Sequence, residues 1–214
     1  MTPVDASAAV LRICQRAPIV PVLVIGDAAK AEGLATALVR GGLPALEITL
    51  RTSEALKAIR EMAKVPGGTV GAGTLLTADD AARAKEAGAT FGVSPGATDE
   101  LLDACERYDL PLLPGAATAT EAMRLLERGY SVQKFFPAEA SGGAPFLKSL
   151  GAPIPQIQFC PTGGISPKNA LDYLSLPNVI CAGGSWVAPP ALVEAGDWNA
   201  IQALAADAAA LPRG

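Results

Sequence analysis

The feature of this sequence that most constrains its fold is an alternation of short apolar runs with longer, alanine-rich amphipathic segments. The runs are rich in β-branched and aromatic residues, which is typical of buried strands. Strands that alternate with helices form a parallel sheet, because each crossover returns the chain to the same end of the sheet. The eight runs are residues 19–25, 45–49, 68–72, 90–94, 110–114, 131–135, 156–160 and 178–182.

The segments between the runs have the length and the termini of helices. Several begin at Ser, Thr or Asp and end at Gly, the residue types that cap helix N- and C-termini. Additional helices are predicted near the two ends of the chain, and we expect the first of them to cover the floor of a closed sheet. The predicted helices are residues 5–17, 28–42, 53–64, 78–89, 98–109, 119–129 and 197–211.

The number of strands and the chain length together predict a closed (β/α)₈ TIM barrel with an extra N-terminal helix and a C-terminal helix. Such barrels use about 200 to 250 residues for one domain, so residues 1–214 are predicted to form a single domain. An α/β fold with a doubly wound open sheet is the alternative, because periodicity does not show closure.

Composition excludes several classes of partner. The net charge of -4 lacks the basic excess that nucleic-acid binding requires. The longest charge-free stretch, residues 173–193, is interrupted by three prolines and a glycine pair, so it is not expected to span a membrane. Residues 1–18 lack the pattern of a secretory signal, which predicts a cytoplasmic protein.

The chain contains no histidine, and this restricts its chemistry. Serine or cysteine hydrolases that depend on histidine are excluded, and proton transfer must use a carboxylate, lysine, tyrosine or cysteine. No zinc site is predicted, because the four cysteines are far apart, lack CxxC spacing and have no histidine to complete a common site. Cys14, Cys105, Cys160 and Cys181 are expected to be reduced and mostly buried.

The residues with useful chemistry follow the predicted strands. In a barrel of this type, the active site forms where the loops after the strands converge. These residues are Glu47 and Arg51 for the second strand, Thr74 for the third, Ser94 and Pro95 for the fourth, Lys134 for the sixth, Thr162, Gly163 and Gly164 for the seventh, and Gly183, Gly184 and Ser185 for the eighth.

Lys134 lies in the stretch "VQKFFPAE", between an apolar run and two phenylalanines. An ammonium group is rarely buried without a partner, because leaving water costs several kcal/mol. One interpretation is a Schiff-base nucleophile, kept neutral by packing against Phe135 or Phe136 and by a nearby cation such as Arg51. The other is a lysine that binds phosphate or forms an ion pair.

Glu47 places a carboxylate in the apolar segment "ALEITL", where burial raises the pKa of an acid. It is the leading candidate for proton transfer, and the alternative is a structural salt bridge to Arg51. The planar guanidinium of Arg51 suits a substrate carboxylate or phosphate. Thr74 offers a hydroxyl after "GAG", whereas Glu139 and Trp186 are expected to have structural roles.

Two glycine pairs, in "TGGIS" and "AGGS", follow the last two strands. Glycine lets backbone N–H groups approach a ligand closely, and barrels of this type often hold phosphate at this position. The alternative is that the glycines only form tight turns. Their occurrence after neighbouring strands favours phosphate binding.

The motifs "LEITLRT", "VGAGT", "SPG", "KFFPAE", "FCPTGGIS" and "GGSW" occur in an order that resembles the 2-keto-3-deoxy-6-phosphogluconate (KDPG) aldolase and 4-hydroxy-2-oxoglutarate aldolase family. The resemblance extends from about residue 18 to residue 189. It implies a cytoplasmic, homotrimeric class I aldolase of the Entner-Doudoroff route, with no cofactor. The implied reaction cleaves KDPG to pyruvate and D-glyceraldehyde 3-phosphate, with 4-hydroxy-2-oxoglutarate as a second substrate.

The resemblance also implies roles for individual residues. Lys134 would form the imine and Glu47 would be the general acid and base. An isomerase or epimerase that uses Lys134 electrostatically, and a non-catalytic phosphosugar-binding module, remain the competing hypotheses. The other implied contacts are Arg51 and Thr74 with the substrate carboxylate, Pro95, Phe136 and Thr162 with the pocket, and Gly163, Gly164, Gly184 and Ser185 with the phosphate.

Overall fold

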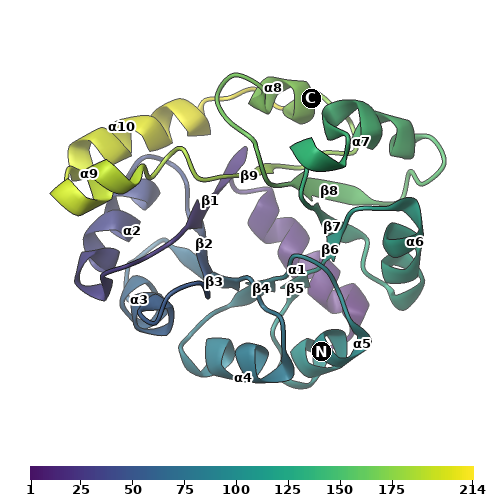
Figure 1. Ribbon diagram of the computed structural model, residues 1–214, viewed down its shortest axis with the longest axis horizontal. Coiled ribbons are helices and arrows are strands. Elements are labelled where there is room, and N and C mark those ends of the chain that lie inside the picture. Colours follow the sequence, from purple (N-terminus) through teal and green to yellow (C-terminus); the bar gives the residue numbers. More distant parts are fainter.

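The computed structural model describes residues 1–214 and shows a ring of parallel strands surrounded by helices (Figure 1). The strands are β1 (Ile19–Leu23), β2 (Ala45–Thr49), β3 (Thr69–Gly73), β4 (Phe91–Val93), β5 (Leu112–Leu113), β6 (Gly115–Ala116), β7 (Val132–Phe135), β8 (Gln158–Pro161) and β9 (Ala182–Gly184). The α-helices are α1 (Pro3–Cys14), α2 (Ala31–Arg40), α3 (Ala55–Met62), α4 (Ala78–Glu86), α5 (Asp99–Arg107), α6 (Ala119–Arg128), α7 (Gly143–Gly151), α8 (Ala170–Leu174), α9 (Pro190–Ala195) and α10 (Trp198–Ala209), and the 3₁₀ helices are η1 (Ala28–Lys30) and η2 (Glu139–Ser141).

The strands close into a barrel through two arcs. Parallel pairing runs in the order β5-β4-β3-β2-β1-β9 in one arc and β6-β7-β8 in the other. β5 and β6 flank Pro114, which has no N–H group to donate, so they are two parts of one interrupted strand. Bridges from Phe159 to Val179 and from Thr162 to Gly183 join β8 to the β9 segment. The predicted barrel is confirmed, and the open sheet is excluded.

The predicted strand bounds agree with the structure to within about two residues, and two of the strands differ in a way that needs explanation. The fifth strand continues past the predicted end at Pro114 as β6, and the last strand begins at Ala182 rather than at residue 178. Before Ala182, the chain is shaped by Asn178, whose buried side chain donates to the carbonyl of Leu147 at 2.9 Å. The start of the predicted run pairs with Phe159 of β8 through one isolated bridge, so it does not form a regular strand.

Threonine caps explain several helix starts. The hydroxyls of Thr77, Thr98 and Thr118 each accept a backbone N–H from the first turn of α4, α5 and α6. The acidic residues Asp80 and Glu121 complete capping boxes at two of these helices. The predicted segment 28–42 is divided into η1 and α2, whereas α7, α8 and α9 have no counterpart among the predicted helices.

Helix α1 covers the floor of the barrel, as expected from the sequence. In Figure 1 it crosses behind the strands, and Val10 and Cys14 belong to the same buried cluster as Phe91 and Val132 from the barrel interior. The Ser7 hydroxyl accepts the backbone N–H of Ser131, just before β7, at 2.9 Å. None of the helices combines the length and apolar character needed to cross a bilayer.

Strand alternation decides which side chains reach the barrel interior. In β2, Leu46 and Ile48 pack with the surrounding helices, while Ala45 belongs to the interior cluster. Glu47 has the same parity as Ala45 and lies nearer the carboxyl end of the strand. The interior is therefore apolar toward α1 and polar toward the opposite mouth.

Candidate active site

Lys134 and Glu47 form a buried ion pair inside the barrel. Lys134 Nζ, on β7, lies 3.4 Å from Glu47 Oε1, on β2. Only 4% of Lys134 and 3% of Glu47 are exposed. The nitrogen also lies 5.1 Å from the centre of the Phe136 ring, whereas Phe135 stacks on Phe146. The structure therefore assigns the packing of Lys134 to Phe136.

The environment of Glu47 makes it suited to proton transfer. Burial raises the pKa of its carboxyl group, and the positive charge of Lys134 opposes this effect only in part. A raised pKa allows an acid to give up and recover a proton nearer neutral pH. The hypothesis of a structural salt bridge between Glu47 and Arg51 is wrong, because the ion-pair partner of Glu47 is Lys134.

Gly73 is a part of this site that the sequence did not reveal. A β-carbon at this position would collide with the Glu47 carboxylate, because β2 and β3 are adjacent and both face the interior here. The available signal was the second glycine of "VGAGT", next to a strand with an interior acid. Gly73 leaves the space that the Glu47 carboxylate occupies.

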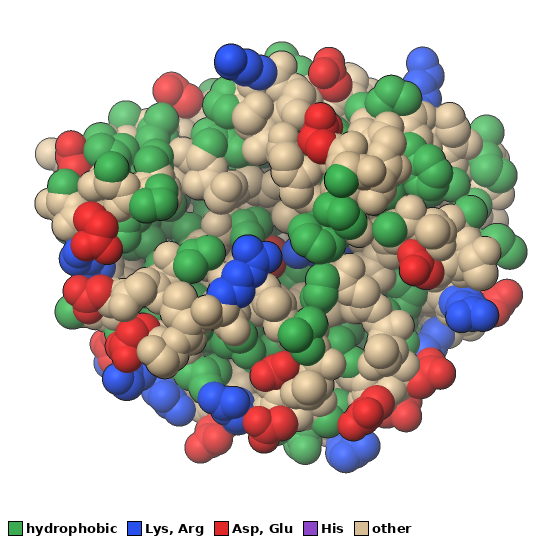
Figure 2. All heavy atoms as spheres, in the orientation of Figure 1, with side chains coloured by type: hydrophobic (Ala, Val, Ile, Leu, Met, Phe, Trp, Pro, Cys, Tyr) green, Lys and Arg blue, Asp and Glu red, His purple; other side chains and the backbone are tan.

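Arg51 and Thr74 are brought together on the loops that follow β2 and β3. Arg51 Nε donates to Thr74 Oγ1 at 3.3 Å, and the Thr74 backbone adopts a left-handed φ of 61°. Arg51 is exposed, so its remaining donors are free to contact a ligand. A hollow near the centre of one face has positively charged side chains beside it (Figure 2).

Thr162 supplies a buried hydroxyl at the mouth. It is 6% exposed, and its Oγ1 has no hydrogen-bond partner in the protein. A buried hydroxyl without a partner indicates a place where a ligand completes the hydrogen bonding. The Ser94 hydroxyl is also buried and unpaired. The sequence places Ser94 at the end of a predicted strand but gives no signal that assigns it to the site.

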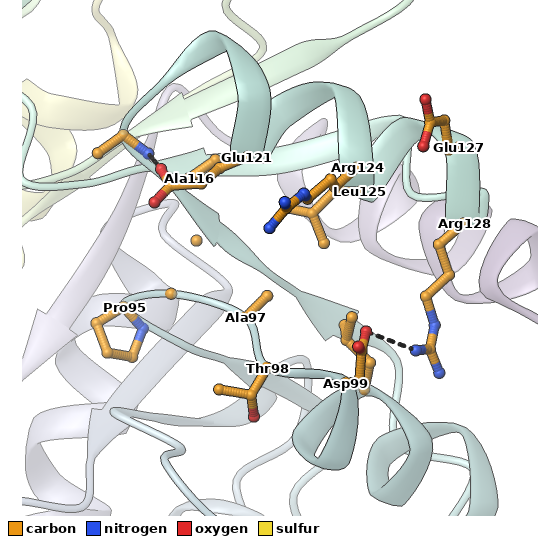
Figure 3. Close-up of a pocket in the computed structure, with 14 residues that line it drawn as sticks. Pro95, Ala97, Thr98, Asp99, Ala116, Glu121, Arg124, Leu125, Glu127 and Arg128 are labelled. Carbon is orange, nitrogen blue, oxygen red and sulfur yellow. Dashed lines mark hydrogen bonds and ion pairs between the residues drawn. The ribbon is translucent and has the colours of Figure 1, made fainter.

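Pro95 follows β4 at the carboxyl end of the strand, as predicted. Its carbonyl group packs against Gly115, where no side chain would fit. It also lines a cavity of about 640 Å³ between α5 and α6, into which Arg124 projects (Figure 3). This cavity contains neither Lys134 nor Glu47. Pro95 therefore adjoins the site through Gly115, the β6 residue that pairs with Lys134, and not through this cavity.

The segments 162–166, named here the glycine loop, and 184–187 present free backbone donors. The N–H groups of Gly163, Gly164 and Ile165 donate to no acceptor in the protein, and neither do those of Ser185 and Trp186. Gly163 and Gly164 have φ values of 103° and 80°, which favour glycine. Successive N–H groups of this kind form an anion-binding concavity.

The two segments with free donors are neighbours, because Thr162 and Gly183 form a parallel bridge. Trp186 lies over Gly184, where a β-carbon would collide with its ring, as expected for a packing role. Thus the predicted phosphate-binding residues lie together at the mouth that contains Lys134 and Glu47. The pattern of free N–H groups could not be read from the sequence.

Fold and site together define the class as a (β/α)₈-barrel enzyme with a buried lysine–glutamate pair at the carboxyl ends of its strands. The family described as "KDPG and KHG aldolase" matches residues 10–204 of the chain. The chain belongs to this family.

Two relatives illustrate the similarity in sequence. The 2-dehydro-3-deoxy-phosphogluconate aldolase of Pseudoalteromonas atlantica is 53% identical, over 92% of this chain and 93% of the relative. The KHG/KDPG aldolase of Escherichia coli K12 is 49% identical, over 89% of this chain and 90% of the relative. Both matches extend over nearly the whole barrel.

Two solved structures illustrate the similarity in fold. The KDPG aldolase of Zymomonas mobilis ZM4 with 3-phosphoglycerate has a TM-score of 0.93 and 47% identity, covering 97% of this chain and 98% of that one. The KDPG aldolase of Legionella pneumophila, with pyruvate captured as a covalent carbinolamine intermediate, has a TM-score of 0.90 and 43% identity, covering 94% and 98%.

Proposed function

We propose that this protein is a class I aldolase that cleaves KDPG to pyruvate and D-glyceraldehyde 3-phosphate and also acts on 4-hydroxy-2-oxoglutarate. The observation that carries the proposal is the distance of 3.4 Å between Lys134 Nζ and Glu47 Oε1 inside the barrel. Transfer of one proton between these groups gives a neutral amine and a carboxylic acid. These are the two species that imine formation requires.

In the first half of the reaction, the Lys134 amine attacks the C2 carbonyl of the substrate. The new N–C2 bond gives a carbinolamine, and Glu47 donates a proton to the hydroxyl as it leaves as water. An iminium on Lys134 and a Glu47 carboxylate result. The carbinolamine captured in the Legionella pneumophila relative supports this route.

In the second half, the Glu47 carboxylate takes the proton of the C4 hydroxyl. The C3–C4 bond breaks, its electron pair moves toward the iminium nitrogen, and D-glyceraldehyde 3-phosphate leaves. Protonated Glu47 then returns its proton to C3 of the enamine. Water adds to the resulting iminium and gives one proton to the Glu47 carboxylate, and collapse of the carbinolamine releases pyruvate and restores the Lys134 amine and the Glu47 acid.

The remaining residues hold the substrate in position. Arg51 and Thr74 bind the carboxylate next to C2, and Phe136, Thr162 and Pro95 line the path of the carbon chain. The glycine loop and Gly184–Ser185 bind the phosphate through backbone N–H groups. Phosphate binding is remote from the reacting carbons, so its energy is available to orient them. The 3-phosphoglycerate in the Zymomonas mobilis relative supports a site for phosphorylated ligands.

Borohydride reduction in the presence of pyruvate, followed by intact mass and peptide mapping, tests the mechanism. The expected result is a reduced pyruvyl adduct on Lys134 that is absent from Lys134→Arg. A folded wild-type protein without this adduct would overturn the aldolase mechanism. An electrostatic role in an isomerase or epimerase, or a phosphosugar-binding module, would then be the better interpretation.

The family resemblance also supports a homotrimer. Analytical ultracentrifugation at several protein concentrations tests it, and a purely monomeric species would contradict it.

A further inference from the structure

We propose that Glu139 and Tyr173 form a clamp that shapes the glycine loop for phosphate, and so set the preference for phosphorylated over unphosphorylated substrates. Both are positioning residues. The inference rests on the proposed function, because it concerns the phosphate end of the same substrate.

The first support is the way the backbone next to Glu139 orients the glycine loop. Ala138 N–H donates to the Thr162 carbonyl at 2.8 Å, and Glu139 N–H donates to the Gly163 carbonyl at 3.1 Å. In a trans peptide the carbonyl and the N–H point in opposite directions. Anchoring these two carbonyls therefore turns the N–H groups of Gly163 and Gly164 away from the β7–α7 connection.

The third free donor is oriented in the same way. Asn169 Nδ2 donates to the Gly164 carbonyl at 3.1 Å, and this peptide carries the N–H of Ile165. All three free N–H groups therefore belong to peptides whose carbonyls are held on the opposite side. The loop is preorganised to bind an anion, which reduces the entropic cost of binding.

The second support is the side chain of Glu139, which lies across the glycine loop. A β-carbon placed on Gly164 would stand only 2.8 Å from Glu139 Cβ, so the methylenes of Glu139 cover this glycine closely. Beyond them, Glu139 Oε1 accepts a hydrogen bond from the Tyr173 hydroxyl. Tyr173 is 1% exposed and lies on α8, directly after the loop. The Glu139 side chain is therefore held at two points, by its methylenes against Gly164 and by the Tyr173 hydroxyl at its carboxylate.

The third support is electrostatic. A carboxylate close to a bound phosphate would repel it. The hydrogen bond from Tyr173 holds the Glu139 carboxylate toward α8 and Gly143, so the loop faces methylene groups instead of the charge. Burial and the negative charge of Glu139 raise the pKa of Tyr173, so this hydroxyl keeps its proton and donates at neutral pH.

The test compares Tyr173→Phe with Glu139→Gln, the double variant and Tyr108→Phe as a matched tyrosine control. Loss of a hydrogen bond to a charged group predicts that Tyr173→Phe raises KM for KDPG about tenfold while kcat changes little. Inhibition of cleavage by inorganic phosphate should weaken by a similar factor. Glu139→Gln in the Tyr173→Phe background should recover part of the loss, because it removes the repelling charge.

The unphosphorylated substrate separates the clamp from a general structural role. The kcat/KM for 4-hydroxy-2-oxoglutarate and borohydride trapping of pyruvate on Lys134 should stay within about twofold of wild type. Equal losses for both substrates, or unchanged phosphate inhibition, would overturn the clamp. If Tyr173→Phe does not fold, Glu139→Ala decides, because it removes both the methylenes over Gly164 and the acceptor of Tyr173, and an unchanged phosphate inhibition constant in that variant would also overturn the clamp. Failure of the proposed function is distinct, because the wild-type protein would then form no pyruvate adduct.

Discussion

Burying Glu47 beside Lys134 has a cost that can be measured. The pKa of the Glu47 carboxyl is raised above its ordinary value of 4.5, chiefly because burial disfavours the charged form. The folded protein therefore holds this proton at pH values where the unfolded chain has released it. A site tuned for proton transfer is in this way also a site that lowers stability when it ionises.

The variant Glu47→Gln should reveal this cost as a pH dependence. Stability contributed by protonated Glu47 is fully present below the pKa of the unfolded chain and is lost as the pH rises through the raised pKa of the folded protein. We expect the free energy of unfolding of the wild type, relative to Glu47→Gln, to fall across this window by about 1.4 kcal/mol per pH unit. Urea denaturation at a series of pH values measures it, and a difference that rises with pH would contradict it.

Gly73 should be required for activity, because a side chain at this position would occupy the space of the Glu47 carboxylate. In Gly73→Ala, the new β-carbon would displace the Glu47 carboxylate, so we expect kcat/KM to fall at least tenfold with a loss of stability of about 1 to 3 kcal/mol. Gly26→Ala is the matched control, because no atom lies within 4 Å of its added β-carbon. Wild-type activity in Gly73→Ala would show that Glu47 tolerates displacement.

At the scale of elements, the regular pattern of the sequence is enough to predict most strands. β2 is predicted with its observed bounds, because five buried residues at 45–49 are flanked by turn signals. The division at Pro114 follows from the missing N–H of proline, whereas the late start of β9 depends on how its segment pairs with β8, which periodicity does not contain. The short helices α8 and α9 offer too few turns for a clear amphipathic pattern.

The candidate site also has some features that the sequence predicts and others that only the folded structure shows. Lys134 and Glu47 can be selected from the sequence because a charged residue in an apolar strand is unusual. Their mutual distance, the free N–H groups of the glycine loop and the contact between Glu139 and Tyr173 exist only after closure of the barrel. Motif order therefore predicts which residues take part, whereas the preorganisation of the site requires the fold.

The floor helix α1 is attached to the barrel partly through Ser7, which is 3% exposed. In Ser7→Ala the half-buried N–H of Ser131 loses its acceptor, so we expect a loss of about 1 kcal/mol in the free energy of unfolding. Catalysis should be unchanged, because Ser7 lies at the end of the barrel opposite the site. Urea denaturation with Ser175→Ala as an exposed control measures the loss, and equal stabilities would argue against this role.

At the scale of the whole molecule, the end of the barrel near α1 mainly stabilises the fold, and the opposite end carries the reactive groups. The interior near α1 is filled by apolar side chains and three thiols, whereas the opposite mouth holds the ion pair and the free backbone donors. Charged groups destabilise a core, and here they are confined to the end where loops can adapt to substrate. The apolar end can therefore compensate for the cost of the buried pair.

Cysteine reactivity can test whether this apolar end opens as one unit. Cys14, Cys160 and Cys181 come from α1, β8 and the segment before β9, and they belong to one buried cluster. Cys105 lies on α5, and burial raises the pKa of its thiol to about 12. A reagent cannot reach thiols that are buried in this way, so modification should require opening of the fold.

We expect pulse labelling with N-ethylmaleimide to modify Cys14, Cys160 and Cys181 at one common rate at each urea concentration. That rate should follow global unfolding, because each of the three thiols is at most 2% exposed. Peptide mass mapping measures the sites separately, and the denatured protein gives the reference rate for each thiol. Cys14 labelling much faster than Cys160 would show instead that α1 lifts from the barrel while the strands stay closed.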